Sequence, residues 1–454
     1  MLGVIGYVLI QFAIGVWVSR RIKTNADFVI AGRTLGVGLV AFSVYATFFG
    51  AEAIVGTAGS VYEDGLKGGQ ADPFGYGIAI LIVALVFAVP LWRRGIITFA
   101  DFFRQRYSPF VEKLVVIVLL PGSIFWAAAQ VRAFGQIVSS ATDLSVTTAI
   151  VVAAFVVIGY SVLGGLLADA WTDFVQGLAI VIGLLVLAIV VASELGGFEA
   201  SLARVEPERF RTISLEEGGL LGFLEGLAIP ICGTVVAVEI ISRVLGARSA
   251  EIARNGAFIG GIMYLAVGLI PVYLGLVGPG LVAELDHAEQ IVPQLAEKLL
   301  PTLLYIAFAG AVISAILSTI DSVLLASSAQ VAHNIWTAVV PAQSDRGQLL
   351  TTRLTLVALG MVAFAISLTY ERVSDMVEIA SAAGSAGVFV AAVFGLFTRF
   401  GGALAATAAI VVGALSWLLL GAVLELNAPY LAALTLALGC YVAVAAAERR
   451  RTQA

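Results

Sequence analysis

Charged residues are scarce in this chain. Asp, Glu, Lys and Arg together make up 12% of the 454 residues, and hydrophobic residues make up 60%. A soluble domain carries roughly 25% charged residues, so a chain of this composition could not cover its surface with groups that favour water. The sequence therefore predicts a polytopic membrane protein, with the lipid bilayer as its surroundings.

Cysteine and histidine are rarer still, with two residues of each. Cys232 and Cys440 lie far apart in apolar runs, and they predict neither a disulfide framework nor a metal site. His287 and His333 are too few and too separated for a histidine-based metal centre. Because no nucleophile is paired with a histidine, the sequence does not predict an enzyme, and no nucleic-acid partner is expected.

The N-terminus lacks the charge pattern of a signal peptide. Residues 1–19 carry no charged side chain, and Arg20, Arg21 and Lys23 follow the apolar run instead of preceding it. This order is typical of an uncleaved first helix whose N-terminus lies outside the cell.

Apolar runs long enough to span a bilayer recur along the whole chain. A span needs roughly 20 residues, and backbone that crosses lipid must be helical unless it closes into a barrel. Because the runs lack the alternation of a barrel, the sequence predicts an all-α protein of about 13 transmembrane helices, near 1–19, 34–60, 73–92, 113–140, 144–163, 171–193, 218–242, 256–283, 299–335, 353–370, 376–398, 402–424 and 428–447.

The positive charges indicate how these helices are oriented. With the N-terminus outside, 18 of the 25 Lys and Arg residues fall in inner segments, six fall in outer loops, and Arg132 lies within a helix. Cytoplasmic loops of membrane proteins carry this excess. We therefore expect a multi-pass protein of the cell membrane with a cytoplasmic C-terminus.

A polar stripe interrupts the apolar run at 299–335. In a helix, Ala315, Thr319 and Ser322 share one face, and Ser314, Ser318 and Asp321 share the adjacent one. Hydroxyls, a carbonyl and a carboxylate are oxygen ligands for a monovalent cation, and a carboxylate at this depth indicates a functional site. Small and hydroxyl residues also let membrane helices pack closely, so a packing seam is the alternative.

Two of the predicted spans carry signs of a broken helix. Phe49, Gly50 and Glu52 stand in the middle of the second span. The seventh span, near 218–242, carries Glu225, Pro230, Gly233 and Glu239. Since the two spans are five helices apart, they predict two five-helix halves that each begin with an interrupted helix, as in inverted-repeat transporters. Two ordinary kinked helices are the alternative.

Four motifs resemble those of the sodium:solute symporter family. The segment 165–176, which ends in Thr172-Asp173-Phe174-Val175-Gln176, is similar to the family's Gly-Gly and Thr-Asp-x-x-Gln signature. The segment 241–249 resembles its Gln-Arg-x-Leu-Ala-Ala-Lys-Ser stretch, and 317–322 resembles Met-Ser-Thr-x-Asp-Ser. The segment 32–36 also fits, so the resemblance covers about residues 30–400 in the family's order.

The resemblance implies a fold and a division of the chain. The family has a LeuT-type core of two inverted five-helix repeats, which here would be residues 34–193 and 218–398. One extra helix, 1–22, would precede the core, and two more, within 402–447, would follow it.

The resemblance also implies sodium sites. The family's shared site falls on the carbonyls of Ala46, Phe49 and Ala315 and on the hydroxyls of Ser318 and Thr319. Some relatives bind a second sodium closer to the cytoplasm, and its positions here would be Asp173, Ser318, Asp321 and Ser322. A carboxylate pair can instead serve as a gate or bind a proton.

The chain departs from the family where a sugar would bind. Glu52 is followed by Ala53 instead of the Gln of sugar carriers, and Ser242 precedes Arg243 where the family has Gln. The expected solute contacts are Glu52, Gln130, Arg132 and Glu239. A guanidinium suits a carboxylate, so Arg132 indicates either an anionic group on the solute or a salt bridge with Glu52 or Glu239.

These observations predict a secondary active transporter. We expect sodium-coupled symport of a small polar organic solute, such as a carboxylate or an amino acid, into the cell. A proton-coupled carrier and a solute-binding membrane sensor are the alternatives. The sequence does not predict an oligomeric state.

Overall fold

The computed structural model describes residues 13, 17, 18, 22–140, 144–212, 219–282, 285, 287–340, 344–370 and 373–453. The expected N-terminal helix over residues 1–22 lies almost wholly outside them. Within the described part of the chain the regular structure is helical, and an isolated bridge between Leu35 and Ala247 is its one β-type pairing. The all-α fold class is therefore confirmed.

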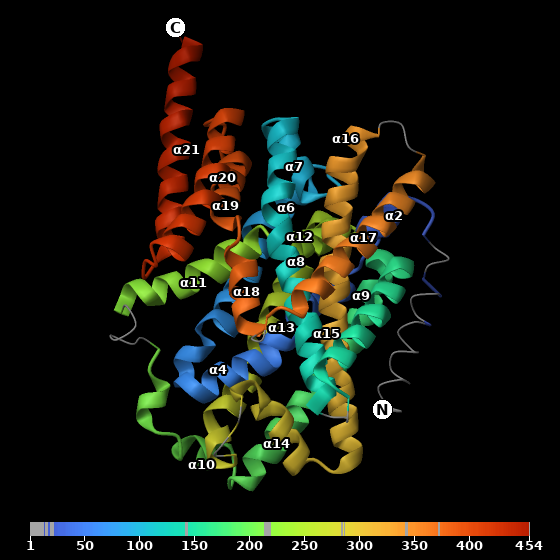
Figure 1. Cartoon of the computed structure of the whole chain (residues 1–454), viewed down its shortest axis with the longest axis vertical. Coiled ribbons are helices and arrows are strands. Elements are labelled where there is room, and N and C mark those ends of the chain that lie inside the picture. The colour runs from blue at the N-terminus through green and yellow to red at the C-terminus, as the bar shows by residue number, and fades with distance from the viewer. Residues whose placement is uncertain are drawn as a thin grey trace.

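Helices follow one another along the described part of the chain (Figure 1). The first part forms α2 (Asn25–Ile30), α3 (Val37–Phe48), α4 (Thr57–Asp64), α5 (Tyr76–Ile82), α6 (Ala88–Trp92), α7 (Phe99–Arg106), α8 (Pro109–Ser140), α9 (Val146–Glu194) and α10 (Phe198–Ala203). The second part forms α11 (Gly219–Val235), α12 (Val238–Gly246), α13 (Ala250–Val277), α14 (Ile291–Leu299), α15 (Thr302–Gln330), α16 (Thr337–Val339), α17 (Asp345–Ser367), α18 (Val373–Ala382), α19 (Ser385–Phe397), α20 (Ala403–Leu418) and α21 (Pro429–Gln453). Wider π-helical turns occur at Glu52–Gly56, Gln70–Gly75, Val83–Phe87, Val331–Trp336 and Leu419–Val423.

The first interruption lies where the sequence predicts it. Helix α3 ends at Phe48, Phe49 leaves the helical conformation at φ −88° and ψ 60°, and a π-helical turn resumes at Glu52 before α4. A Cβ on Gly50 would lie 2.7 Å from Oε1 of Gln130 and 2.8 Å from Oγ1 of Thr319. Since real Cβ atoms do not approach other atoms so closely, a side chain at this position would displace the ends of the Gln130 and Thr319 side chains.

The second interruption is a bend rather than a kink at proline. Pro230 lies inside α11, and the chain turns by 42° only after Val235, between α11 and α12. Val236 and Ala237 form the break. Both predicted broken helices are therefore present, each with an acidic residue close to its break.

Helix α9 joins two predicted spans, 144–163 and 171–193, into one run of 49 residues. Gly165, with φ 56° and ψ −175°, interrupts the helical conformation inside it. A Cβ there would meet the carbonyl oxygen of Phe28 at 2.7 Å. The positive φ and the close approach of α2 both favour glycine.

The number of spans differs from the 13 expected. In the described part of the chain, nine helices are long and apolar enough to cross a membrane, or ten if the bent pair α11–α12 forms one span. Of the predicted spans not counted, 1–19 lies almost wholly outside the described residues, and the spans near 34–60 and 144–163 are represented by the shorter helices Val37–Phe48 and Val146–Gly159. The chain is a multi-pass membrane protein, and the count of 13 is not confirmed.

The ends of the helices separate two faces of the molecule. Helix α7 and the C-terminal end of α21, which carry Arg104, Arg106, Arg449 and Arg450, lie at the top of Figure 1. Helices α10 and α14 lie at the bottom. Between the two faces, α15 packs against α8 and α9, and α3 packs against α9 and α13. The polar stripe of α15 is thereby enclosed by other helices.

Candidate functional site

The polar stripe of α15 is buried. Ser318, Thr319, Asp321 and Ser322 are at most 6% exposed. Because lipid offers no hydrogen-bond partners, polar groups at this depth must find them inside the protein. Their partners come from α3, α9 and α12, and the resemblance implies cation ligands on the first two of these helices.

Thr319 lies beside the first broken helix. Its hydroxyl donates to the carbonyl of Ala315 at 3.2 Å, and it lies 3.5 Å from the carbonyl oxygen of Ala46. Three of the five expected sodium ligands, the Thr319 hydroxyl and the carbonyls of Ala46 and Ala315, therefore lie close together. The Phe49 ring packs between two tyrosines, with its centroid 4.9 Å from the ring of Tyr45 and 5.5 Å from that of Tyr264.

Asp173 joins three helices. Its carboxylate accepts hydrogen bonds from Ser43 of α3, at 2.5 Å, and from Ser318 of α15. Hydrogen bonds to a carboxylate are stronger than those between neutral groups. The expected ligand Ser318 is thus oriented by Asp173, which lies on α9.

Arg243 of α12 is the cation of this region. It is fully buried and forms an ion pair with Asp169 of α9. It also donates to the hydroxyl of Ser322, and its Nη2 lies 4.0 Å from Oδ2 of Asp173. Ser322 in turn donates to Asp169 at 3.1 Å. Sequence reasoning missed Asp169, although this residue lies within the motif at 165–176.

Of the four positions expected for a second sodium, the structure brings three into this network. Asp173, Ser318 and Ser322 take part in it through the hydrogen bonds just described. The fourth, Asp321, is 6% exposed and precedes Ser322 on α15, but none of these hydrogen bonds reaches its carboxylate.

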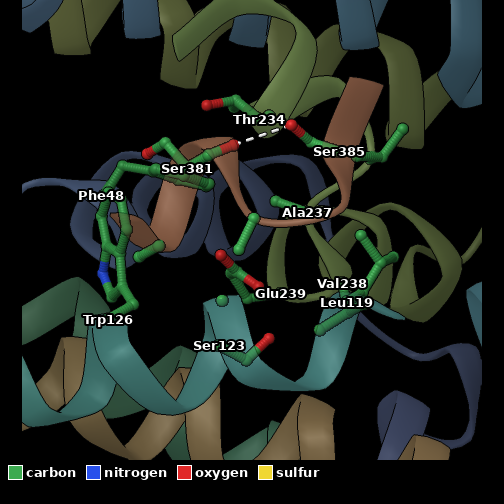
Figure 2. Close-up of a pocket in the computed structure, with 15 residues that line it drawn as sticks. Phe48, Leu119, Ser123, Trp126, Thr234, Ala237, Val238, Glu239, Ser381 and Ser385 are labelled. Carbon is green, nitrogen blue, oxygen red and sulfur yellow. Dashed lines mark hydrogen bonds between the residues drawn. The ribbon is translucent and has the colours of Figure 1, made fainter. Parts of the chain in front are cut away.

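A small cavity lies where the two broken helices meet (Figure 2). Its volume is 40 Å³, and Glu239, at the start of α12, extends its carboxylate toward it. The Phe48 and Trp126 side chains stand together at one side of it, and Ser123 of α8 lies below Glu239. On the opposite side, Ser385 donates to the carbonyl of Ser381 at 2.9 Å.

A larger cavity of 470 Å³ adjoins α4, α11 and α18. Among the described residues, its charged lining consists of four carboxylates and one lysine, namely Glu52, Asp64, Asp72, Glu378 and Lys67. Oδ1 of Asp72 accepts a hydrogen bond from Tyr264 at 2.9 Å, whereas its buried Oδ2 has no hydrogen-bond partner in the described part of the chain.

Three aromatic rings connect the two cavities. Phe48 and Trp126 line the small cavity, and Tyr76 lines the large one. The ring centroids lie 5.9 Å apart for Phe48 and Trp126, 5.7 Å for Tyr76 and Trp126, and 6.3 Å for Phe48 and Tyr76. The Tyr76 hydroxyl lies 2.8 Å from Oγ of Ser381, which lines the small cavity. Asp72 and Tyr76 could not be recognised from the sequence, because they lie at the start of an otherwise ordinary apolar run.

The four expected solute contacts do not share one cavity. Glu52 lines the large cavity and Glu239 the small one, whereas Gln130 accepts a hydrogen bond from the backbone nitrogen of Ala51 at 3.0 Å. Arg132 lines a third cavity, of 330 Å³, together with His287 and Glu289.

Arg132 forms neither of the salt bridges considered from the sequence. Among the described residues, no carboxylate forms an ion pair with its guanidinium. Its buried Nε also has no hydrogen-bond partner there. Glu52 and Glu239 line other cavities.

Known proteins resemble this chain over most of its length. It is 27% identical to a high-affinity choline transporter of Caenorhabditis elegans, covering 81% of this chain and 68% of that protein. The human high affinity choline transporter is 28% identical, with 81% and 67% covered. A sodium/glucose cotransporter of Vibrio parahaemolyticus is 27% identical, with 70% and 65% covered.

Solved structures share the fold. A Na⁺-coupled sialic acid symporter in a substrate-bound outward-open state superposes with a TM-score of 0.87 at 16% identity, covering 98% of this chain and 96% of the other. A nucleobase-cation-symport-1 family transporter gives 0.66 at 14% identity, with 95% and 96% covered. The architecture is therefore that of LeuT-fold transporters, which confirms the fold expected from the motifs.

The sodium:solute symporter family matches residues 28–419. This range includes both broken helices, the buried network around Asp173 and all three cavities. Family and relatives are transporters, not enzymes, and they support sodium-coupled symport. The chain belongs to the sodium:solute symporter family.

Proposed function

We propose that this protein is a sodium-coupled symporter that carries a small organic cation into the cell across the plasma membrane. The observation that carries the proposal is the acidic character of the 470 Å³ cavity, whose lining among the described residues has four carboxyl side chains and one lysine. A cavity lined by one sign of charge raises the local concentration of the opposite sign. Its volume lies within the range of small-molecule sites.

The aromatic rings beside this cavity suit the same class of solute. Tyr76, Phe48 and Trp126 present π-faces or edges within one cluster, and ring faces attract quaternary ammonium groups. The choline transporters among the relatives are named for a solute of this kind. We therefore propose a quaternary or tertiary ammonium compound as the solute.

We propose that the coupling sodium binds beside Thr319. The ligands would be the carbonyls of Ala46, Phe49 and Ala315 and the hydroxyls of Ser318 and Thr319. The short distances from the Thr319 hydroxyl to the Ala46 and Ala315 carbonyls support this arrangement. We also propose that residues 34–193 and 218–398 form the two repeats, and that the N-terminus lies outside the cell.

Arg132 supports a second candidate, an anionic or zwitterionic solute. Its Nε is buried without a partner and its cavity of 330 Å³ could admit a carboxylate. The acidic lining of the larger cavity favours the cation, because a carboxylate there would meet several like charges.

Uptake into proteoliposomes tests the proposal. We expect labelled choline to enter under an inward sodium gradient, to be displaced by other quaternary ammonium compounds, and not to enter when potassium replaces sodium. Glu52→Gln and Asp72→Asn should each lower the apparent choline affinity by about tenfold, which corresponds to about 1.4 kcal/mol. Glu63→Gln, at an exposed position next to the cavity, is the matched control.

Three results would contradict the proposal. Uptake driven by a proton gradient without sodium would favour the proton-coupled carrier. Transport of carboxylates but not of choline would favour the Arg132 site. Saturable binding of solute without any uptake would indicate a sensor.

A further inference from the structure

Tyr264 of α13 contacts both of the sites proposed above. Its hydroxyl donates to Oδ1 of Asp72 at 2.9 Å, at the wall of the 470 Å³ cavity, and its ring packs on that of Phe49. We propose that Tyr264 is a positioning residue that links solute binding in this cavity to sodium binding beside Thr319. The inference rests on the proposed sodium-coupled symport, and it goes beyond it by naming the side chain through which the two binding events affect each other.

The polar end of Tyr264 fixes a carboxylate of the solute cavity. Asp72 and Tyr264 are both buried, at 4% and 1% exposure. A hydrogen bond to a carboxylate is stronger than one between neutral groups. In the described part of the chain, the other oxygen of this carboxylate, Oδ2, has no hydrogen-bond partner. The orientation of the Asp72 carboxylate therefore depends on the Tyr264 hydroxyl.

The apolar end of Tyr264 packs at the break of the first interrupted helix. Phe49 is the residue at which α3 leaves the helical conformation, and its carbonyl is one of the proposed sodium ligands. The rings of Phe49 and Tyr264 are nearly perpendicular, with planes at 80° and centroids 5.5 Å apart, which is a favoured arrangement of aromatic pairs. A sodium ion that fixes the Phe49 carbonyl also fixes the surface on which the Tyr264 ring packs.

Helix α13 runs close to both partners of Tyr264. Gly260 and Gly268 lie one turn before and one turn after it, on the same face of the helix. A Cβ on Gly260 would lie 2.7 Å from the carbonyl oxygen of Ala41 in α3. A Cβ on Gly268 would collide with the side chain of Pro73, which follows the cavity carboxylate in the chain. The backbone of α13 thus packs directly against both segments, and Tyr264 lies between these two contacts.

Binding of labelled choline to detergent-purified protein, in sodium and with potassium in its place, measures the link. In the unmodified protein we expect sodium to raise the choline affinity at least about fivefold. Tyr264→Phe keeps the ring and removes the hydroxyl, so it should lower the choline affinity in sodium about tenfold. Because the route to Asp72 is cut, the effect of sodium on choline affinity should fall below about twofold.

Sodium binding in the absence of choline separates this role from a general loss of structure. Tyr264→Phe retains the ring contact with Phe49, so its sodium affinity without solute should stay within about twofold of the unmodified value. A structural defect at the break would lower the sodium affinity as well. A parallel loss of sodium and choline affinity in this variant would therefore contradict the positioning role.

Tyr273→Phe, on the same helix, is the matched control. The Tyr273 hydroxyl lies 2.8 Å from Oγ of Ser201, and both residues are buried. The substitution therefore removes a hydrogen bond of a buried tyrosine away from the two sites. We expect a lower Tm with unchanged choline affinity and an unchanged effect of sodium. Equal losses of choline affinity in the Tyr273 and Tyr264 variants would overturn the inference.

A double-mutant cycle tests whether the hydroxyl acts through Asp72. Asp72→Asn removes the charge that the hydroxyl orients, so adding Tyr264→Phe should lower the choline affinity by less than about twofold more. Additive losses of the two substitutions would overturn the positioning role. Full choline affinity and a full sodium effect in Tyr264→Phe would overturn the inference and leave the proposed function intact. No choline binding by the unmodified protein in sodium would overturn the proposed function, and the inference with it.

Discussion

Oε1 of Gln130, on α8, accepts a hydrogen bond at 3.0 Å from the backbone nitrogen of Ala51, at the break of the first interrupted helix. A broken helix exposes backbone groups that lipid cannot satisfy. The side chain of a neighbouring helix supplies the missing acceptor here. Gln130 is fully buried. Its Oε1 lies so close to the backbone at Gly50 that a Cβ there would be 2.7 Å away from it.

We predict that Gln130→Met destabilises the protein. The substitution keeps the length of the side chain but removes the acceptor, and a buried donor left without a partner costs about 1–3 kcal/mol. Thermal unfolding in detergent, followed by tryptophan fluorescence, should show a lower Tm. Gln130→Glu keeps an acceptor oxygen and should lose less. Equal stability of the Met variant and the unmodified protein would show that the break does not depend on this bond.

Gly50→Ala should weaken sodium binding. The new methyl would lie 2.8 Å from Oγ1 of Thr319 and 2.7 Å from Oε1 of Gln130, so these side chains must shift, and the proposed ligand Thr319 is one of them. We expect the sodium concentration for half-maximal binding to rise about tenfold, or about 1.4 kcal/mol. Gly38→Ala, in α3 before the break, is the control, because nothing lies within 4 Å of its added methyl. Similar sodium affinities for both variants would refute the assignment.

The double variant Ser318→Ala with Thr319→Ala tests the sodium ligands directly. It removes both proposed hydroxyl ligands, and half-maximal uptake should require at least about tenfold more sodium, again about 1.4 kcal/mol. Ser327→Ala is the matched control, since this buried hydroxyl of α15 has no hydrogen-bond partner in the described structure. Unchanged sodium dependence with normal membrane expression would leave the packing seam as the explanation of the stripe.

The interrupted helices could be predicted from the sequence because their causes are local. A glycine beside a carboxylate in an apolar run, as at Gly50 and Glu52, is rare enough to indicate a break. The position of the second break was less well predicted. The sequence indicated a break within 218–242, where Pro230 and Gly233 lie, but α11 continues past both residues and bends only after Val235.

The ion pairs could not be predicted in the same way. Arg243 and Asp169 are 74 residues apart in sequence, and their contact depends on the packing of α12 against α9 and α15. The helical periodicity of a sequence does not show which residues of different helices form an ion pair. The sequence likewise offered Glu52 and Glu239 as partners for Arg132, and the fold places all three in different cavities.

Asp101, whose carboxylate accepts hydrogen bonds from backbone N–H groups at the start of α7, gives a prediction about pH. It lies in the first turn of α7, outside the membrane spans. Burial alone would raise the pKa of its carboxyl, but His333 and the backbone N–H groups of Thr98 and Ile97 lower the pKa below the usual value of 3.8. A lowered pKa means that the ionised form stabilises the fold at higher pH, and that this contribution is lost as the pH falls below about 3.8.

We therefore expect the Tm of the unmodified protein to fall more steeply below about pH 4 than that of Asp101→Asn, which has already lost this contribution. Asp345→Asn, at an exposed position in the first turn of α17, is the control and should keep the steep fall. Parallel pH profiles for the unmodified protein and Asp101→Asn would contradict the assignment.

Arg132 gives the prediction that separates the two classes of solute. If the solute is a cation held in the acidic cavity, Arg132→Gln should leave choline affinity within about twofold, because Arg132 lines another cavity. It should also leave the Tm nearly unchanged, since no carboxylate in the described structure pairs with this side chain.

If a carboxylate of the solute pairs with Arg132, Arg132→Lys should already weaken binding at least about tenfold, because a single ammonium cannot replace the two parallel hydrogen bonds of a guanidinium. Solute-dependent thermal shifts of the Gln and Lys variants, with choline and with small carboxylates in the presence of sodium, measure both outcomes. Loss of carboxylate binding in these variants, together with no response to choline in the unmodified protein, would overturn the cation proposal.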